Sequence, residues 1–201
     1  MDLIVGGGRF GLKVAEYLNS KGRDFVVLDP NDECEVAKRF RAKVIKAEAK
    51  DLEKFIKEFD PEWVFPTAPI HVAAEALHGK FRPWNEKVNE ILSGLPAKVI
   101  VSVGRGTIVV SYNRDELCLD NCSSPERCPV TKLKRPCPMY ELIRFACPDV
   151  KMLISYQLSP GIGAIRGKDL ALVLEESKKV EKIVLATACN CHGIITALRS
   201  F

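Results

Sequence analysis

The chain has 201 residues, of which 47% are hydrophobic and 28% are charged, and this composition excludes a wholly disordered protein. The 30 lysines and arginines against 26 acidic residues leave a net charge of +4, which is too small to indicate nucleic acid as a partner. The apolar stretch at residues 183–189 is far shorter than the roughly 20 residues of a membrane-spanning helix. The first apolar residues run straight into three glycines, unlike a signal peptide. We therefore expect a cytoplasmic protein with no membrane insertion and no nucleic-acid partner.

The first part of the chain alternates between short apolar strands and amphipathic helices. Apolar runs predict strands, and apolar residues at helical spacing predict the helices between them. The predicted strands are residues 2–5, 24–28, 43–46 and 62–65, and the predicted helices are residues 10–20, residues 33–40 and a segment from residue 51. Repeated β-α units of this length imply a parallel sheet with right-handed crossovers.

The later part of the chain is less regular. Two β-rich runs joined by Gly104-Arg105-Gly106 predict a hairpin. The following residues, up to Pro138, are rich in Cys, Pro, Ser and Arg and have no apolar periodicity. After them, α/β order returns, with predicted helices at residues 139–146 and 168–179, strands at 150–156 and 182–187, and a terminal helix at 193–199.

A glycine-rich motif, Gly6-Gly7-Gly8-Arg9-Phe10-Gly11, joins the first strand to the first helix. It matches G-x-G-x-x-G, in which Gly6 permits the sharp turn, Gly8 lets a pyrophosphate approach the backbone, and Gly11 lets the helix pack closely on the sheet. The helix start offers free N–H groups to the anion. Arg9 and Phe10 begin this helix, and Arg9 can reach a phosphate or extend into solvent.

An acidic residue, Asp29, stands at the end of the second strand, where a carboxylate can accept hydrogen bonds from the adenosine ribose. A 2′-phosphate would meet a like charge there, so NAD(H) is favoured over NADP(H), with ADP or AMP as alternatives. The other reading of the motif is a Rossmann-like turn that binds nothing.

These features predict an α/β protein with one doubly wound, mostly parallel Rossmann-like sheet and a cysteine-rich insertion. The expected parts are a dinucleotide-binding domain at residues 1–110, a cysteine-rich segment at 111–138, and a C-terminal α/β portion at 139–201 that completes the same sheet. The alternative architecture is a nucleotide domain followed by a small separate C-terminal domain.

Residues 3–76 resemble the nucleotide-binding domain of the Trk-type potassium uptake regulators and the regulators of potassium conductance. The similarity lies in Ile4–Gly11, in Val26–Asp29, and in Val44–Glu48, where the family usually has a Gly-Asp-Ala-Thr-like turn. The resemblance implies a Rossmann fold, binding of NAD(H) or an adenine nucleotide, and a homodimer.

The end of the fourth strand supplies two further candidates. In open α/β sheets, ligands lie outside the carboxyl ends of the strands, so Thr67 and His71 are expected to face the second half of a dinucleotide. His71 is the candidate for proton transfer, because imidazole titrates near neutrality. The alternative is a surface histidine in the first turn of a helix.

Four cysteines in the irregular segment have the composition of a metal site. They are Cys118, Cys122, Cys128 and Cys137, and two of them are followed by proline. Thiolates suit zinc or an iron–sulfur cluster, although this spacing matches neither a ferredoxin motif nor a C-x2-C zinc knuckle. The alternative is a surface loop with reduced thiols.

A second constellation, Cys189-Asn190-Cys191-His192, is predicted at the start of the terminal helix, where the helix dipole makes thiols more reactive. Cys189 and Cys191 are therefore candidates for a nucleophile, a redox pair or further metal ligands, and simple burial is the alternative.

Taken together, the sequence predicts an NAD(H)-binding protein that acts in redox chemistry or in redox and nucleotide sensing. The alternative function is a non-catalytic nucleotide-sensing module.

Overall fold

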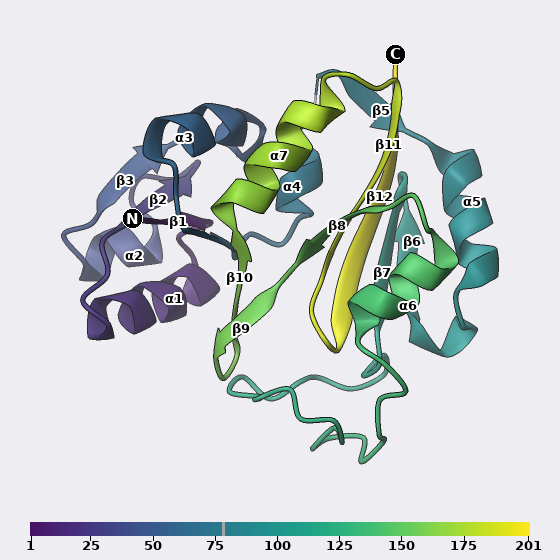
Figure 1. Cartoon of the computed structure of the whole chain (residues 1–201). Helices are drawn as coiled ribbons and strands as arrows, with labels where there is room; N and C mark the ends of the chain where they lie inside the picture. The colour runs from purple at the N-terminus through teal and green to yellow at the C-terminus, as the bar shows by residue number, and fades with distance from the viewer. Residues whose placement is uncertain (78) are drawn as a thin grey trace. The chain divides into compact units, whose positions relative to one another are not determined.

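The computed structural model describes residues 1–77 and 79–201, which form two compact units. The first unit consists of Met1–His78 and Ala164–Lys178, and the second consists of Gly79–Gly163 and Lys179–Phe201. Figure 1 labels the elements of both units.

The first unit contains a sheet with the strand order β3-β2-β1-β4-β10. The strands β3, β2, β1 and β4 run parallel to one another, and β10 pairs antiparallel with β4. In chain order, its elements are β1 (Asp2–Val5), α1 (Arg9–Ser20), β2 (Phe25–Asp29), α2 (Glu35–Arg39), β3 (Lys43–Lys46), the 3-10 helix η1 (Ala49–Asp51), α3 (Leu52–Phe59), β4 (Trp63–Pro66), α4 (Val72–Glu75), β10 (Ile162–Arg166) and α7 (Gly167–Ser177).

Helices cover both faces of this sheet. Helices α1 and α2 pack together on one side, and α3 packs with α7 on the other (Figure 1). All four residues of β1 are buried, as expected for a central parallel strand with helices on both faces. The first unit is therefore doubly wound, as the β-α alternation predicts.

The second unit contains a mixed sheet with the strand order β6-β7-β12-β11-β8. All neighbouring pairs are antiparallel except β11 and β8, and β5 adds to the end of β12. In chain order, its elements are β5 (Phe81–Pro83), α5 (Asn85–Gly94), the 3-10 helix η2 (Ala97–Val99), β6 (Ile100–Gly104), β7 (Thr107–Ser111), α6 (Met139–Ala146), β8 (Lys151–Ile154), β9 (Tyr156–Ser159), β11 (Lys182–Ala188) and β12 (His192–Ser200).

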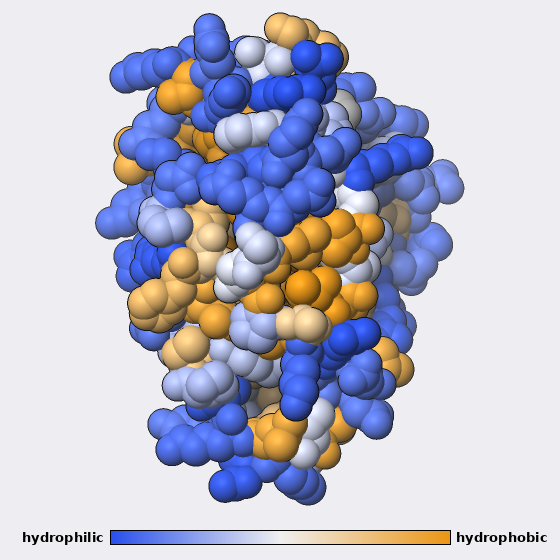
Figure 2. Space-filling view, turned by 90° about the vertical axis from the view of Figure 1, so that its right-hand side faces the viewer, coloured by the Kyte–Doolittle hydropathy of each residue, from blue (hydrophilic) through white to orange (hydrophobic). Residues whose placement is uncertain are grey.

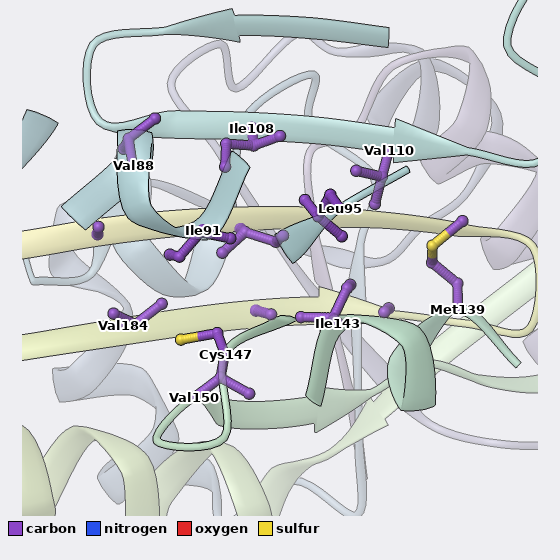
Figure 3. Close-up of a cluster of buried hydrophobic side chains, with 14 of the residues drawn as sticks. Val88, Ile91, Leu95, Ile108, Val110, Met139, Ile143, Cys147, Val150 and Val184 are labelled. Carbon is purple, nitrogen blue, oxygen red and sulfur yellow. The ribbon is translucent and has the colours of Figure 1, made fainter. Parts of the chain in front are cut away.

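The core of the second unit lies between this sheet and the two helices α5 and α6 (Figure 3). Ile91 of α5 and Ile143 of α6 point into the same cluster as Ile108 and Val110 of β7. A β-carbon at Gly193 of β12 would lie 2.7 Å from Cδ1 of Ile143, so the helix crosses the strand where a glycine makes room.

Two expectations about the fold are corrected. The C-terminal part, residues 139–201, is divided between two sheets: β10 and α7 belong to the first unit, whereas β8, β11 and β12 form a second sheet with the hairpin of β6 and β7. The predicted terminal helix at residues 193–199 is wrong, because these residues form the strand β12. This strand pairs with β7 on one side and with β11 on the other, and its Ile194, Ile195 and Thr196 are β-branched.

Other expected elements of the second unit are confirmed. The hairpin turns at Arg105 and Gly106, both of which have positive φ, and helix α6 has the predicted bounds.

Val101 and Val103 of the edge strand β6 are 43% and 49% exposed. Figure 2 shows exposed hydrophobic side chains among hydrophilic ones. In the part of the chain that is described, every helix is too short or too polar to span a membrane.

Candidate functional site

The glycines after β1 shape a tight β-α turn in the first unit. Gly6 has φ +107, and a β-carbon there would lie 2.7 Å from the backbone nitrogen of Ala68. A β-carbon at Gly11 would collide with the carbonyl oxygen of Gly6. Only glycine fits either position, because one has left-handed backbone geometry and both are crowded by backbone atoms.

Gly8 differs from these two glycines. A β-carbon at Gly8 would meet nothing within 4 Å, and its φ of −75 suits any residue. Gly8 is the N-cap of α1, whose first turn holds no acidic residue and receives no side-chain cap. The first N–H groups of a helix have no intrahelical acceptor. The open space at Gly8 therefore lies where a helix N-terminus favours an anion.

Asp29, at the carboxyl end of β2, lies beside this turn. Its Oδ2 accepts a hydrogen bond of 2.6 Å from the N–H of Gly7, and its Oδ1 accepts one of 2.8 Å from the N–H of Asn31. Each carboxylate oxygen has two lone pairs, so both can accept a second donor. The carboxylate is thus held in one orientation while it keeps acceptor capacity for a ligand hydroxyl.

Thr67, Arg9 and Phe10 surround the same turn. The Thr67 hydroxyl lies 2.6 Å from the carbonyl oxygen of Gly6 and 3.0 Å from that of Val5, so it donates to the backbone and ties the end of β4 to the turn. The guanidinium carbon of Arg9 lies 5.0 Å from the ring centre of Phe10, and the Phe10 side chain is exposed. Thr67 was expected to face the second half of a dinucleotide. In the structure its hydroxyl proton is directed at the backbone, so Thr67 stabilises the turn.

His71 lies at the N-terminus of α4 and is only 6% exposed. Burial lowers the pKa of its imidazole to about 3. At neutral pH the ring is therefore neutral and shielded from solvent. The expected role of His71 in proton transfer depends on titration near neutral pH. An imidazole with this lowered pKa does not titrate there.

The second unit gathers six of the eight cysteines in one region: Cys118, Cys122, Cys128, Cys137, Cys189 and Cys191. The first four belong to the cysteine-rich segment expected at residues 111–138. Every residue of this segment is described, and apart from Ser111, which ends β7, none lies in a helix or a strand of a sheet. The last two belong to the β11–β12 turn, residues 189–191. The expected helix start at Cys189 is wrong, because the residues from His192 to Ser200 form the strand β12.

His192 links the turn to the segment. Its Nε2 lies 3.1 Å from Sγ of Cys118, and its Nδ1 lies 3.7 Å from Sγ of Cys189. A second link joins Cys191 to the segment, because its Sγ lies 2.8 Å from Nη1 of Arg135 and 3.2 Å from Oγ of Ser124. Two stretches of chain that are distant in the sequence therefore meet through their sulfur atoms.

Several groups act on the thiol of Cys118. Burial raises the pKa of its thiol, the Asn113 amide 3.2 Å away opposes this rise, and the sulfurs of Cys122, Cys128 and Cys191 raise the pKa further. Like charges disfavour the charged form of a thiol.

Cys128 shows the opposite shift of pKa. Burial tends to raise the pKa of its thiol, but hydrogen bonds from Thr131 and from the backbone of Val130 outweigh burial and lower it. Donors directed at a sulfur stabilise the thiolate form.

Cys137 lies at the edge of this group, with its Sγ 3.6 Å from the hydroxyl of Tyr112. Burial and the Cys137 sulfur raise the pKa of that hydroxyl. Among the described residues, no three His, Cys, Asp or Glu side chains already have the arrangement of metal ligands.

Sequence reasoning included His192 in the second constellation but missed the contacts that Asn113, Ser124 and Arg135 make with the cysteines. Arg135 and Ser124 lie within the segment, but nothing in their spacing shows that they reach the turn. The only available signal was the position of His192 next to Cys191.

The fold and these contacts define a mixed α/β protein with a glycine-rich β-α turn in one unit and a cluster of free thiols in the other. Two family models match the chain: AF_1314_C, described as "Uncharacterized protein, C-terminal domain", at residues 62–201, and AF_1314_N, described as "Uncharacterized protein, N-terminal domain", at residues 1–72. The chain belongs to this AF_1314 family.

A relative from Archaeoglobus fulgidus, described as "Uncharacterized protein", is 51% identical over 213 residues, which cover 99% of both chains. Among solved structures, UDP-glucose 4-epimerase with UDP-glucose from Thermotoga maritima is 22% identical with a TM-score of 0.31. That match covers 47% of this chain and 30% of the epimerase, so the chain spans less than a third of the epimerase's length.

Proposed function

We propose that the first unit binds NAD(H) through its ADP half, and that the protein acts in redox chemistry or in redox and nucleotide sensing. The observation that carries this proposal is the position of the Asp29 carboxylate, 2.6 Å from the N–H of Gly7 and directly beside the open space at Gly8. An acceptor for ribose hydroxyls and an uncapped helix start thus share one turn.

The diphosphate would lie over Gly8 at the start of α1. There the backbone has no β-carbon, and the positive end of the helix dipole points at the ligand. Arg9, the first residue of this helix, is exposed and can approach the outer phosphate oxygens. The helix start carries no acidic residue that would compete with a phosphate.

The ribose of the adenosine would bind at Asp29. Its two hydroxyls are donors, and the second lone pairs of the carboxylate oxygens are the matching acceptors. A 2′-phosphate would face this carboxylate as a like charge, so the site should prefer NAD(H) to NADP(H). ADP and AMP carry the same ribose and remain alternative ligands.

Calorimetry with NADH, NAD⁺ and ADP tests the proposal directly. We expect heat of binding for all three nucleotides with the unchanged protein, and its loss in Gly8→Val, whose side chain fills the space over the turn. Gly104→Val is the matched control, because a β-carbon at Gly104 also meets nothing within 4 Å but lies in the second unit. Absence of binding by the unchanged protein would overturn the proposal.

A nucleotide-sensing module without catalysis is the second candidate. It is favoured by His71, whose buried imidazole is neutral at physiological pH and is unsuited to proton transfer there. Turnover distinguishes the two candidates. Oxidation of bound NADH by an added electron acceptor supports an enzyme, and tight binding without turnover supports a sensor.

The homodimer and the cytoplasmic location stay predictions. The homodimer follows from the resemblance to the potassium-transport regulators, and sedimentation with and without NADH tests it. A monomer under both conditions would contradict this expectation, whereas the nucleotide proposal would be unaffected.

A further inference from the structure

We infer that the cysteine-rich segment and the β11–β12 turn form one metal site, in which thiolates from both stretches hold zinc or an iron–sulfur cluster. The inference concerns the second unit alone and does not depend on nucleotide binding by the first. It differs from a site made by the four cysteines of the segment, because it requires sulfur ligands from the turn.

The first argument is convergence of sulfur. Sγ of Cys118 in the segment lies 3.1 Å from Nε2 of His192, directly after the turn, and Sγ of Cys191 in the turn lies 2.8 Å from Nη1 of Arg135 and 3.2 Å from Oγ of Ser124 in the segment. Core packing does not explain this gathering, because the six sulfurs are intermediate or exposed rather than buried.

The second argument is the direction of the hydrogen bonds. Backbone N–H groups two or three residues downstream donate to three of the sulfurs: Ser124 to Cys122 at 3.3 Å, Thr131 to Cys128 at 3.5 Å, and both Cys191 and His192 to Cys189 at 3.4 Å. Each of these cysteines begins a turn whose amides point at its own sulfur. Such donors stabilise a thiolate, which is the form that binds metal.

Side chains supply the same kind of donor to two more sulfurs. The Asn113 amide donates to Cys118 at 3.2 Å, and the Arg135 guanidinium donates to Cys191 at 2.8 Å. The guanidinium also brings a permanent positive charge next to the sulfurs. A metal centre bound by four thiolates carries net negative charge. The Arg135 guanidinium would therefore stabilise both the metal-bound site and the thiolates without metal.

The other two cysteines provide an internal comparison. Cys147 is 1% exposed, lies in the core of the second unit (Figure 3), and donates its S–H to Oδ1 of Asp149 at 3.0 Å. Burial raises the pKa of this thiol to about 12, so it stays protonated. Cys34 is buried in the first unit beside Gly7. Ordinary packing accounts for these two residues but not for the six clustered ones.

Soft thiolate sulfur is the preferred ligand of zinc and of iron–sulfur clusters. Each cysteine that binds would release its proton to solvent, and no electron transfer is needed for ligation. A zinc–sulfur bond is about 2.3 Å long. Among the described residues no three His, Cys, Asp or Glu side chains already have the arrangement of metal ligands, so the cysteine side chains must move to bind the metal. The metal would then cross-link a segment that has no helix or strand of its own to a turn of the sheet.

Anaerobic purification of the whole chain, followed by metal analysis and visible absorption, tests the inference. Zinc would be expected at about one atom per chain without colour. An iron–sulfur cluster would appear as a brown protein with iron and acid-labile sulfide in roughly equal amounts. If the purified protein lacks metal, reconstitution with Zn²⁺ alone, and separately with Fe³⁺, sulfide and a thiol reductant, should restore one of these signatures.

Variants distinguish the joint site from a site of the segment alone. Cys122→Ser in the segment, Cys191→Ser in the turn and a Cys189→Ser/Cys191→Ser double variant should lower metal content, whereas the buried Cys147→Ala should keep it. Thermal unfolding and circular dichroism check that each variant is folded. For the unchanged protein, a chelator should lower the thermal midpoint and added metal should restore it, which gives a measurement independent of any variant.

Two results would overturn the inference. One is a folded protein that contains no zinc or iron and takes up neither in reconstitution. The other is full metal content in the double variant of the turn, because the four cysteines of the segment would then suffice. Both results leave the calorimetric test of nucleotide binding unaffected, so failure of this site and failure of the proposed function can be told apart.

Discussion

The N–H of Gly7 donates a hydrogen bond of 2.6 Å to the carboxylate of Asp29, which joins the end of β2 to the turn after β1. This bond fixes the carboxylate next to the open space at Gly8. It uses one lone pair of Oδ2, and the N–H of Asn31 uses one lone pair of Oδ1, so each oxygen keeps a second lone pair for a ligand. The same contact therefore positions a ribose acceptor and stabilises the glycine-rich turn.

Asp29→Asn should weaken NADH binding and reduce the preference for NADH over NADPH. Asparagine can still accept from Gly7, but it lacks the charge that strengthens bonds to ribose hydroxyls and repels a 2′-phosphate. A lost charge-assisted bond is worth about 1.5–3 kcal/mol, or roughly a tenfold to hundredfold rise in Kd. Titration calorimetry with both nucleotides measures this, with the exposed Asp32→Asn as the control. An unchanged preference would contradict the role of Asp29.

Substitution by alanine should affect stability at Gly11 and nucleotide binding at Gly8. A β-carbon at Gly11 would collide with the carbonyl oxygen of Gly6, so Gly11→Ala should lower the free energy of unfolding by about 1–3 kcal/mol. A β-carbon at Gly8 meets nothing, so Gly8→Ala should unfold like the unchanged protein while it binds NADH more weakly. Denaturant unfolding and calorimetry on the two variants measure both effects. Equal loss of stability in both would show that Gly8 serves packing.

The β-α order of the first unit could be predicted because its information is local. Each of the first four strands is a short apolar run followed by an amphipathic helix, and the turn at Gly6 and the carboxylate at Asp29 lie at element boundaries that residue types mark. The lone antiparallel strand β10 could not be predicted, because its partner β4 lies about a hundred residues earlier in the chain.

The second sheet shows where local patterns fail. Residues 193–199 combine a glycine with an apolar run, and such a run is compatible with a buried helix or with a strand paired on both sides. Residues 193–199 form a strand because they pair with β7 and β11. The sequence of these residues alone does not indicate either partner. This error also misplaced Cys189 and Cys191 at a helix start. The meeting of Cys191 with Arg135 was unpredictable for the same reason, since it depends on where the turn of that sheet lies.

His71 should not titrate near neutral pH. Its burial lowers the imidazole pKa from 6.5 to about 3, so the folded protein stays unprotonated there while the unfolded chain takes up a proton as the pH falls below 6.5. The contribution of His71 to stability is therefore complete above pH 6.5 and declines as the pH falls toward 3. Imidazole resonances followed by NMR, with His71→Gln for assignment, measure the midpoint. A midpoint near 6.5 would contradict the buried position and restore His71 as a proton donor.

Glu53 should make the first unit sensitive to acid. Its carboxylate on α3 lies 2.7 Å from Nζ of Lys178 and 2.8 Å from Nζ of Lys57, and these two ammonium groups lower its pKa from 4.5 to about 2. Because the folded pKa is depressed, the unfolded chain binds more protons between pH 4.5 and 2. The stabilisation is thus complete above pH 4.5 and is lost as the pH falls through 2.

Glu53→Gln removes this contribution, so the thermal midpoints of the variant and the unchanged protein should differ most near neutral pH and converge in acid. High salt should also reduce the difference, because the pairs are partly exposed. Glu58→Gln, an exposed position on the same helix, is the matched control and should show a smaller difference at neutral pH. A difference between Glu53→Gln and the unchanged protein that stays constant down to pH 2 would show that the two lysines do not hold the carboxylate in its charged form.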